Sequence, residues 1–291
     1  IGHARVLGHE VSGTVSRLGE GVTGFAEGEA VVVRPLLACG ACPACAAGHA
    51  HICHKLTFLG LDSDGGFRDF WSVPATVLHK VPAGATLRHA ALVEPLAVAC
   101  HDVRRARLVA GEDALVVGGG PIGLLIAIVA RRTGANVTIC EPNPTRRDMC
   151  EGFGFATLDP AAGDLGAVVA ARTGQKGVEV AFEVSGAAAA VRTITDAVAT
   201  RGRIVMVAIH TEPRPVDLFR FFWRELEMIG ARVYEPQDFD EALALLADGA
   251  VDADRFVTDV RPLEEIAAAF AAADGAVQSM KTLIDVNGET A

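Results

Sequence analysis

The sequence predicts an α/β protein in which a β-rich first part is followed by a doubly wound parallel sheet. Up to about residue 90, short β-branched runs alternate with glycines and show no helical period. From Glu94 onward, strand-like and helix-like segments alternate, which is typical of a parallel sheet built from βαβ units. A glycine-rich turn at residues 118–123 joins one such strand to one such helix. With 291 residues, 51% of them hydrophobic, the chain is long enough for two domains.

The first part, placed at residues 1–96, is expected to hold four strands. Val11–Val15 alternates between apolar and small polar residues, and Glu29–Val33 is a short β-branched run. The glycines between these two segments indicate turns. Phe67–Val73 and Thr76–Val81 are the other two candidate strands.

The second part, placed at residues 97–233, is expected to form the parallel sheet. Its strands are predicted at Ala114–Val117, Asn136–Cys140, Val178–Val184, Arg203–Ile209 and Met228–Val233. Its helices are predicted at Pro121–Thr133, Thr145–Phe153, Leu165–Thr173, Ala187–Thr200 and Val216–Glu225. Residues 234–291 are expected to return to the first domain, with helices at Phe239–Ala247 and Leu263–Ala273 and a strand at Lys281–Val286.

Composition and charge exclude several classes of protein. Lys and Arg number 26 against 36 Asp and Glu, a net charge of −10, so neither nucleic acid nor a membrane is an expected partner. The apolar content excludes a disordered chain. The most apolar run, Leu115 to Ala130, falls short of the roughly 20 residues of a membrane helix. Because the sequence also shows no signal peptide, we expect a cytoplasmic protein.

Four of the seven cysteines lie close together, at Cys39, Cys42, Cys45 and Cys53. This clustering and the odd total argue against a secreted disulfide framework and favour a reducing compartment. Four thiolates spaced C-x2-C-x2-C-x7-C can close a tetrahedral zinc shell, which leaves no position for a substrate. The sequence therefore predicts a structural zinc. An iron–sulfur cluster or a redox dithiol pair stays open, because four cysteines also hold such clusters.

The glycine-rich turn has the features of a dinucleotide-binding site. It follows a strand and opens a helix, whose free N–H groups suit a diphosphate. Its candidate cofactor-binding residues are Gly118, Gly120, Pro121, Ile122 and Gly123. Glu141 ends the next strand, where a carboxylate can accept both ribose hydroxyls and repel a 2′-phosphate, which favours NAD over NADP. Arg146 and Arg147 weaken this preference, since an arginine there can bind such a phosphate. The alternative is an ordinary βα turn with a solvent-facing glutamate.

A second metal site is possible between the two domains. His9 and Glu10 precede the first strand, and Glu94 lies at the domain junction. Histidine and glutamate suit an open zinc site, and a cleft between domains is a usual place for a ligand. Taken alone, however, such a pair more often caps an element or lies on the surface.

Taken together, these motifs resemble the zinc-dependent medium-chain alcohol dehydrogenase family. The stretch Gly8 to Gly19, the four-cysteine loop, the Glu94-Pro-Leu-Ala-Val segment and the turn at residues 118–123 occur in the order of that family. The Glu94-Pro-Leu segment is similar to the polyol branch, which includes sorbitol, butanediol and threonine dehydrogenases. The resemblance covers nearly the whole chain.

The resemblance implies a GroES-like catalytic domain with a catalytic zinc. In that family the residue at His9 is a ligand of this zinc. Glu10 would be a direct ligand, as in the polyol branch, or would orient the ligands as in other members. Glu94 would contact the zinc-bound water or alternate as a ligand. Glutamates in such places orient the ligands and tune the bound water.

The resemblance also implies a Rossmann domain that binds NAD. Val207, Ala208 and Ile209 would meet the carboxamide of the nicotinamide through their backbone, and Arg232 would touch cofactor or substrate. Members of the family assemble through the last Rossmann strand, here near Met228–Arg232. A homodimer or homotetramer is therefore expected.

One feature departs from the family pattern. The family's first catalytic ligand is a cysteine a couple of dozen residues before the histidine, with a proton-relay serine and histidine beside it. Only eight residues precede His9 in this sequence, which starts at Ile1. We expect an upstream segment of roughly sixty residues, because a GroES-like barrel without its first strands would expose unpaired strand edges.

The implied activity is hydride transfer between a secondary alcohol or polyol and NAD, with zinc as the Lewis acid. L-threonine or butanediol dehydrogenase-type activity is one alternative. A zinc-independent reductase on the same scaffold is another. The third is a catalytically incomplete, nucleotide-binding member of the same superfamily.

Overall fold

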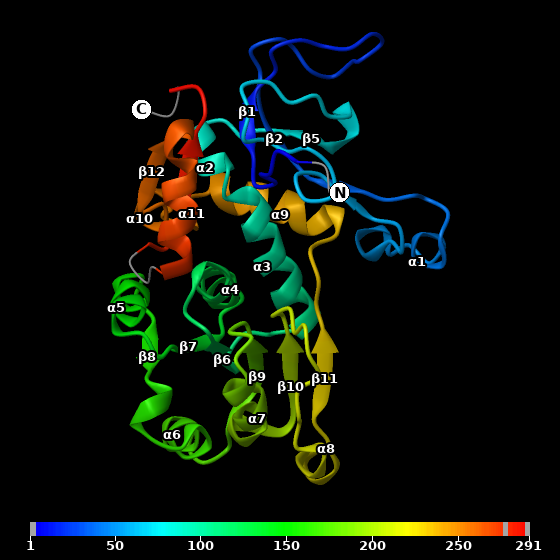
Figure 1. Cartoon of the computed structure of the whole chain (residues 1–291). Helices are drawn as coiled ribbons and strands as arrows, with labels where there is room; N and C mark the ends of the chain where they lie inside the picture. Colours follow the sequence, from blue (N-terminus) through cyan, green and yellow to red (C-terminus); the bar gives the residue numbers. More distant parts are fainter. Residues whose placement is uncertain (1–3, 276–278, 289–291) are drawn as a thin grey trace. The chain divides into compact units, whose positions relative to one another are not determined.

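The computed structural model describes residues 4–275 and 279–288. The chain divides into two compact units, each of which is drawn in Figure 1. Unit 1 comprises Ile1–Val98 and Val233–Ala291, and unit 2 comprises Ala99–Arg232. The division falls within helix α3 (Val93–Ala106), which the sequence patterns had not indicated as a helix. The predicted α/β class, with a β-rich part and a parallel sheet, is confirmed.

Unit 2 is built around a six-stranded parallel sheet. Its strands are β6 (Asp113–Val117), β7 (Asn136–Cys140), β8 (Ala156–Leu158), β9 (Val178–Glu183), β10 (Val198–Met206) and β11 (Glu227–Gly230). They lie in the order β11-β10-β9-β6-β7-β8, so the chain starts in the middle of the sheet and changes direction between β6 and β9. Doubly wound sheets bind their ligands at such a reversal, outside the carboxyl ends of the strands.

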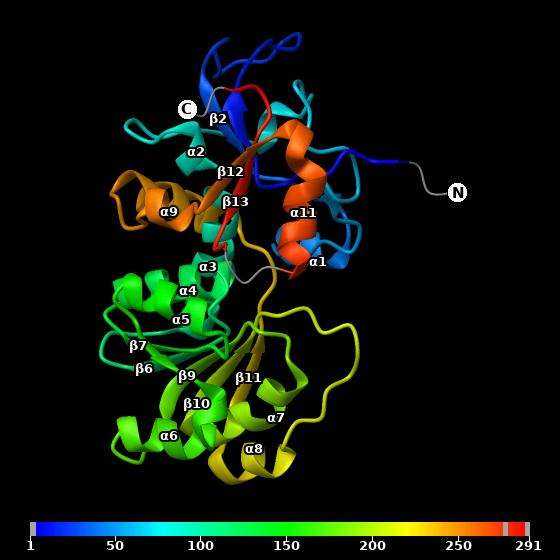
Figure 2. The same ribbon diagram turned by 60° about the vertical axis from the view of Figure 1, so that its left-hand side comes forward.

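Helices cover both faces of this sheet. They are α4 (Pro121–Arg132), α5 (Pro144–Gly152), α6 (Leu165–Arg172), α7 (Ala188–Ala197) and α8 (Leu218–Arg224), with a 3₁₀ turn at Pro160–Ala162. Figure 2 shows α4 and α5 on one face and α6, α7 and α8 on the other. Because both faces are covered, the central strands are mostly apolar, and Val116, Ile139 and Ile204 are fully buried.

The predicted strands of unit 2 all form, with shifts at some ends. β7 has the predicted bounds. β10 starts at Val198, well before the predicted Arg203, and α7 accordingly ends at Ala197. A register irregularity between Val198 and Arg203 accounts for this difference, since an irregular strand start carries no clear period-2 pattern. β8 was not predicted, because three residues are too few to show a period.

Unit 1 is β-rich. Its main sheet is antiparallel, in the order β1 (Ser12–Thr14), β2 (Ala30–Val33) and β5 (Leu78–Lys80). A short antiparallel pair joins β3 (Leu36–Leu37) to β4 (Thr57–Phe58), and a parallel pair joins β12 (Asp259–Pro262) to β13 (Thr282–Asp285). Val33, Leu59 and Val77 form a small core beneath the main sheet.

The helices of unit 1 are short, apart from two in its C-terminal segment. They are α1 (Pro43–Ala46), α2 (Leu87–Ala90), α9 (Pro236–Ala247), α10 (Ala253–Phe256) and α11 (Ile266–Gly275), with 3₁₀ turns at Ala50–Ile52, Ala75–Val77 and Leu263–Glu265. The predicted helices after residue 234 and the closing strand are present, with shifted ends. Of all helices in the described ranges, none is long and apolar enough to cross a bilayer.

One predicted strand is wrong. Residues Phe67–Val73 form bends and irregular chain instead. The N–H groups of Gly65, Gly66 and Phe67 donate to carbonyls of residues 6–8 at 2.7–3.0 Å, so this stretch makes an irregular contact rather than a ladder. Part of its apolar surface faces solvent, since the side chain of Phe70 is 72% exposed. The strand predicted at Thr76–Val81 begins only at Leu78, after a 3₁₀ turn.

Candidate active site

Glycines determine where His9 lies. Gly8 has a φ of 108°, and its carbonyl oxygen accepts a hydrogen bond from the N–H of Gly66 at 2.9 Å. A Cβ atom on either Gly60 or Gly65 would stand 2.2 Å from that same oxygen, so neither position has room for a side chain. The backbone leading into His9 is therefore held against residues 60–66. The imidazole itself meets the ring of Phe58 edge-on, with centroids 5.1 Å apart.

His9, Glu10 and Glu94 come together in unit 1. Each offers one ligand atom, and these atoms lie within 4.8 Å of one another. His9 and Glu10 are half-buried in the loop before β1, whereas Glu94 is buried in the first turn of α3. One imidazole nitrogen and two carboxylates are a donor set that suits zinc. The structure thus brings together the three residues that the sequence singled out for a catalytic metal.

Tyr234 holds Glu94. Its hydroxyl donates a hydrogen bond to Oε1 of Glu94 at 3.0 Å, and both residues are almost fully buried. Burial raises the pKa of Glu94 to about 7, although the bond from Tyr234 opposes the rise. Tyr234 is the single tyrosine of the chain and follows Val233, whose φ of 49° is unusual for a β-branched residue. No sequence pattern pointed to Tyr234.

Lys281 is a second residue that sequence reasoning missed. Its ammonium group contacts Oε2 of Glu10. Burial lowers the pKa of Lys281 to about 8. Burial, and to a lesser extent the charge of Lys281, also lowers the pKa of His9. A neutral imidazole is the form that binds a metal, so this environment favours His9 as a ligand.

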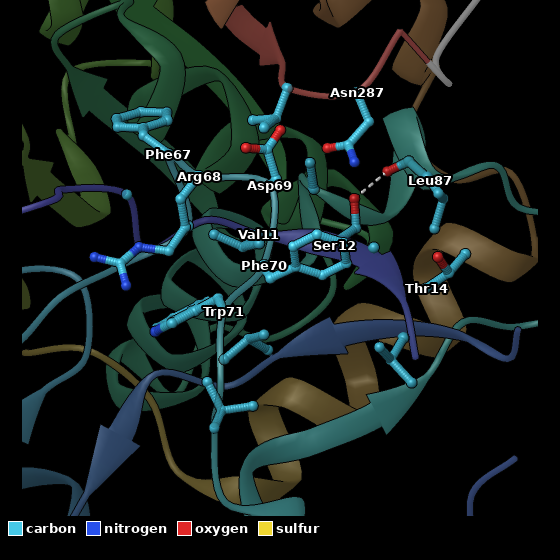
Figure 3. A pocket seen from close by; sticks show the side chains of 18 of the residues that line it. Val11, Ser12, Thr14, Phe67, Arg68, Asp69, Phe70, Trp71, Leu87 and Asn287 are labelled. Atoms are coloured by element: carbon cyan, nitrogen blue, oxygen red, sulfur yellow. Dashed lines mark hydrogen bonds between the residues drawn. The ribbon is translucent and has the colours of Figure 1, made fainter. Parts of the chain in front are cut away.

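A groove of about 890 Å³ runs along unit 1, and its lining includes His9 and Glu10. Figure 3 shows apolar side chains in its wall beside a smaller number of polar ones. The hydroxyl of Ser12 donates to the carbonyl of Leu87 at 2.5 Å, which ties β1 to α2. The labelled lining residues are Val11, Ser12, Thr14, Phe67, Arg68, Asp69, Phe70, Trp71, Leu87 and Asn287.

The four predicted cysteines form one cluster, between β3 and β4. All four are free thiols, and their sulfurs lie within 4.8 Å of one another. The Sγ of Cys42 is 3.5 Å from that of Cys45 and 3.8 Å from that of Cys53, and Cys39 is 3.5 Å from Cys53. Four sulfurs around a zinc with Zn–S bonds of about 2.3 Å would be about 3.8 Å apart. The cluster therefore has the size of a tetrahedral zinc site.

Backbone N–H groups prepare the sulfurs of this loop for a cation. His54 donates to Cys42 at 3.4 Å, and both Cys39 and Lys55 donate to Cys53 at 3.3 Å. Hydrogen bonds from the backbone of Cys45 and His54 lower the pKa of Cys42 to about 6. In contrast, burial and the neighbouring thiols raise the pKa of Cys45 to about 12. The thiol of Cys42 thus loses its proton readily, whereas the thiol of Cys45 needs a nearby cation to become a thiolate.

The glycine turn in unit 2 leaves its backbone open. Gly120 is the N-cap of α4 and has no side-chain cap, so the first N–H groups of the helix are free for a ligand. A Cβ on Gly123 would stand 1.8 Å from the carbonyl oxygen of Gly118, which makes glycine obligatory there. Pro121 and Ile122 open the helix between these glycines. The turn thus has the form that a diphosphate requires.

Glu141 lies where the sequence placed it, at the end of β7, but it is 4% exposed rather than solvent-facing. Its carboxylate accepts hydrogen bonds from the N–H of Gly119 at 2.7 Å and of Asn143 at 2.9 Å. Arg146 reaches the same turn, because its Nη1 is 3.8 Å from where a Cβ on Gly120 would stand. The Nε of Arg146 is buried and has no hydrogen-bond partner in the described part of the chain. An unpaired Nε–H of an arginine beside open backbone N–H groups fits an anionic ligand.

The remaining candidate residues lie at the end of β10 and of unit 2. Val207 and Ala208 each donate a backbone hydrogen bond to the carbonyl of Glu183 at 3.0 Å. Ile209 is 91% exposed. Arg232 is exposed at the end of unit 2.

Comparisons with known proteins agree with this arrangement. Residues 2–83 match the alcohol dehydrogenase GroES-like domain, and residues 121–248 match the zinc-binding dehydrogenase domain. The 2-dehydro-3-deoxy-L-galactonate 5-dehydrogenase of Pseudoalteromonas atlantica is 53% identical over 98% of this chain and 84% of its own length. The chain belongs to the zinc-dependent medium-chain alcohol dehydrogenase family.

Three further proteins match this dehydrogenase at 32–35% identity. L-galactonate-5-dehydrogenase of Escherichia coli is 35% identical over 91% of this chain and 78% of its own length. The crystal structure of 2R,3R-butanediol dehydrogenase from Bacillus subtilis superposes with a TM-score of 0.90 at 34% identity, covering 97% of this chain and 80% of that one. A protein from Sinorhizobium meliloti, assigned as a zinc-binding dehydrogenase and bound to NADP, gives 0.90 at 32% identity, covering 97% and 84%.

Family membership confirms the expected fold and class of activity. The first domain is GroES-like, and the parallel sheet is Rossmann-like. The dehydrogenase is a zinc-dependent oxidoreductase of alcohols or polyols, and it uses a nucleotide cofactor. The residues described above fit both groups, since the His9 cluster supplies nitrogen and oxygen donors and the turn at Gly120 supplies N–H groups.

Proposed function

We propose that this dehydrogenase oxidises a secondary hydroxyl group of a polyol or sugar acid, with NAD as the hydride acceptor, and that it reduces the corresponding ketone in reverse. The convergence of His9, Glu10 and Glu94 within 4.8 Å supports this proposal most directly. A dinucleotide turn in unit 2 of the same chain adds to it.

His9, Glu10 and Glu94 are the residues that would hold the catalytic zinc. When bound, the ion supplies Lewis acidity, which lowers the pKa of the substrate hydroxyl. Tyr234 engages Oε1 of Glu94, so Oε2 of that carboxylate would be the oxygen available to a zinc ion. Lys281 engages Oε2 of Glu10 in the same way. Such contacts fix the direction in which ligand side chains point.

The second zinc of the proposal is structural and would be held by the four-cysteine loop. The distances between sulfurs and the N–H donors to them support it. Thiols must stay reduced to bind the metal, so a reducing compartment such as the cytoplasm is proposed. We also propose the domain roles: catalysis for residues 1–96, NAD binding for 97–233, and a return to the catalytic domain for 234–291.

NAD rather than NADP is proposed because of Glu141. Its buried carboxylate at the end of β7 would oppose a second negative group at the ribose. Arg146 and the NADP-bound relative from Sinorhizobium meliloti favour the other cofactor. Dissociation constants for NADH and NADPH decide between them. Glu141→Ala should reduce the preference for NADH over NADPH. If the unsubstituted protein bound NADPH more tightly than NADH, the proposal would be wrong.

A sugar acid is the substrate class we propose to test first. The relatives at 53% and 35% identity are both named for oxidation of galactonate derivatives at carbon 5. Sorbitol, (R,R)-butanediol and L-threonine dehydrogenases are similar at 32–33% and define the alternatives.

Self-association is proposed through one edge of unit 2. Strand β11 is an edge strand, and Met228 on it is 44% exposed. On the preceding helix α8, Leu218, Phe219, Phe222 and Trp223 are 65–78% exposed, and the rings of Phe219 and Trp223 stack. An exposed apolar surface of this extent is typical of a protein–protein interface. The same surface of a second copy can pack against it through two-fold symmetry.

The decisive experiment measures NADH formation from a panel of sugar acids, sorbitol, butanediol and threonine, before and after removal of zinc by a chelator. We expect turnover with at least one substrate, loss on chelation, and recovery when zinc is returned. His9→Ala should lose turnover, whereas His54→Ala changes a histidine outside the cluster and should keep it. Turnover that survives zinc removal would refute the mechanism. Binding of nucleotide without any turnover would favour the non-catalytic alternative.

A further inference from the structure

Glu183, the last residue of β9, carries a fully buried side chain. A carboxylate in such a place has to be hydrogen-bonded. Its Oε1 accepts from the N–H groups of Ser185 and Gly186, each at 3.0 Å, and from the hydroxyl of Ser185 at 2.6 Å. Its Oε2 accepts from Nε2 of His210 at 3.0 Å. The two oxygens therefore bind two different loops.

These two loops follow β9 and β10, which are parallel neighbours in the sheet. The main-chain carbonyl of Glu183 accepts the N–H groups of Val207 and Ala208 at 3.0 Å. Glu183 thus holds residues 207–210 at both ends, by its carbonyl at the start and by its carboxylate at the end. Ile209, between the two attachments, is 91% exposed.

The same loops adjoin the dinucleotide turn. The N–H of Ser185 lies 3.0 Å from where a Cβ on Gly118 would stand, so the loop after β9 touches the turn directly. The carboxyl ends of β6, β9 and β10 form one edge of the sheet, because the three strands are parallel neighbours. Residues 207–210 therefore belong to the edge at which such sheets hold a dinucleotide.

Among the described residues, the imidazole of His210 has one hydrogen bond, the bond from Nε2 to Glu183. Its Nδ1 is buried and has no partner among the described residues. Burying Nδ1 without a hydrogen bond destabilises the folded protein. The hydrogen bond from Nε2 to Glu183 is the contact that can offset this penalty. A bond to an ionised carboxylate is of the stronger kind.

We propose that His210 is a positioning residue for the nicotinamide half of the cofactor. Acting through Glu183, it fixes the backbone of Val207, Ala208 and Ile209, which would receive the carboxamide. This inference rests on the proposed NAD function and adds a residue to it. Because His210 acts on that segment alone, only ligands with a nicotinamide ring should sense its loss. ADP-ribose, which lacks the ring and keeps the rest, should not.

The test compares dissociation constants for NADH and ADP-ribose by calorimetry. In His210→Phe, which keeps a planar ring and loses the donor, NADH should bind about tenfold more weakly, and ADP-ribose within about twofold of the unsubstituted protein. His210→Gln, whose amide can donate to Glu183, should recover most of the NADH affinity. Glu141→Ala should weaken both ligands. Glu212→Gln changes an exposed carboxylate nearby and should weaken neither.

Three results would overturn the inference. Equal weakening of both ligands in His210→Phe would show a general loosening of the sheet edge, and unchanged NADH affinity would show no positioning. If the unsubstituted protein bound neither ligand, the proposed cofactor use would fail and this inference with it. Should His210→Phe not fold, His210→Asn, whose shorter amide does not span the distance to Glu183, must show the same split between the two ligands.

Discussion

The hydroxyl of Tyr234 donates to Oε1 of Glu94 at 3.0 Å, and the two residues lie 140 positions apart in the sequence. The preceding residue, Val233, has a φ of 49°, a conformation that costs about 1–3 kcal/mol for such a side chain. This cost persists because the surrounding structure requires it. The backbone at the start of the C-terminal segment is thus bent in a way that places Tyr234 on a candidate zinc ligand.

Tyr234→Phe removes this hydrogen bond and keeps the ring. A bond to a carboxylate is worth about 1.5–3 kcal/mol, so we expect zinc at the His9 cluster to be held roughly tenfold more weakly or more. kcat/KM should fall by a similar factor. Competition with a chromophoric chelator measures the affinity, and steady-state kinetics measure kcat/KM. Zinc affinity equal to that of the unsubstituted protein would show that Tyr234 only fills space.

The pH dependence of stability should report Glu94 in the metal-free protein. Its pKa is about 7 when folded, against 4.5 for an unperturbed glutamate. The folded state therefore binds more protons between these values, so stability is greatest below about pH 4.5 and falls as the pH rises through 7. Glu94→Gln should flatten this fall and make the metal-free protein more stable at pH 8.

Chemical unfolding in the presence of a chelator, repeated from pH 5 to 8, measures this effect. His9, whose pKa is lowered from 6.5, contributes with the opposite sign in part of the range. The difference between the two proteins isolates Glu94. Lys281, with a pKa near 8, acts only at higher pH, where stability should rise as its neutral form is reached. Parallel curves for the unsubstituted and Glu94→Gln proteins would contradict the prediction.

Cys42→Ser should remove one metal ion per chain and destabilise unit 1. Loss of a structural metal is among the few single changes that cost more than about 4 kcal/mol. Metal analysis and thermal unfolding measure the two effects. Cys150→Ser is the matched control, because it changes a buried thiol outside the loop and should leave the metal content unchanged. Full metal content in Cys42→Ser would rule out the four-sulfur site.

Gly119→Ala and Gly120→Ala should differ although they are neighbours. A Cβ on Gly119 would lie 3.0 Å from Cβ of Glu141 and 3.3 Å from the sulfur of Cys150, whereas on Gly120 the nearest atom is 3.8 Å away. We expect overpacking to lower the free energy of unfolding by about 1–3 kcal/mol in the first variant, and no such loss in the second. Urea unfolding measures both. Equal stabilities would mean that Glu141 moves aside without cost.

Phe222→Asp should break the proposed self-association. Phe222 is 78% exposed, so the charge should cost the separate chain little, while it would be buried in the interface. Sedimentation should show a smaller assembly than the unsubstituted protein forms. Val109→Asp, at a 57% exposed position outside α8 and β11, should leave the assembly intact. The same assembly in both variants would place the interface elsewhere.

The parallel sheet was predictable because its signals are local. Each strand is a short apolar run, each helix has a period, and the two alternate; β7 was predicted to the residue. Unit 1 was less predictable. The segment Phe67–Val73 is apolar enough for a strand, yet the N–H groups of Phe67 and of the two glycines before it bond to residues 6–8 in an irregular contact that no period reveals.

The candidate site divides in the same way. Cys39 to Cys53 and the turn at residues 118–123 are compact motifs, so sequence located them. A zinc-ligand role for His9 and Glu94 could be predicted only from the order of several motifs along the chain. Tyr234, Lys281 and the pair Glu183–His210 carry no motif, because each acts through one contact with a residue far away in sequence.

The carbonyl oxygen of Gly8 leaves no room for a methyl group at residue 60 or at residue 65. A scan of every possible substitution would therefore mark two chemically inert positions as indispensable, as if they took part in the reaction. Engineers who wish to retune substrate choice gain a practical rule from this. Residues 60 and 65 should stay glycine in any such library, whereas Phe70, whose ring stands in solvent, has room for other side chains.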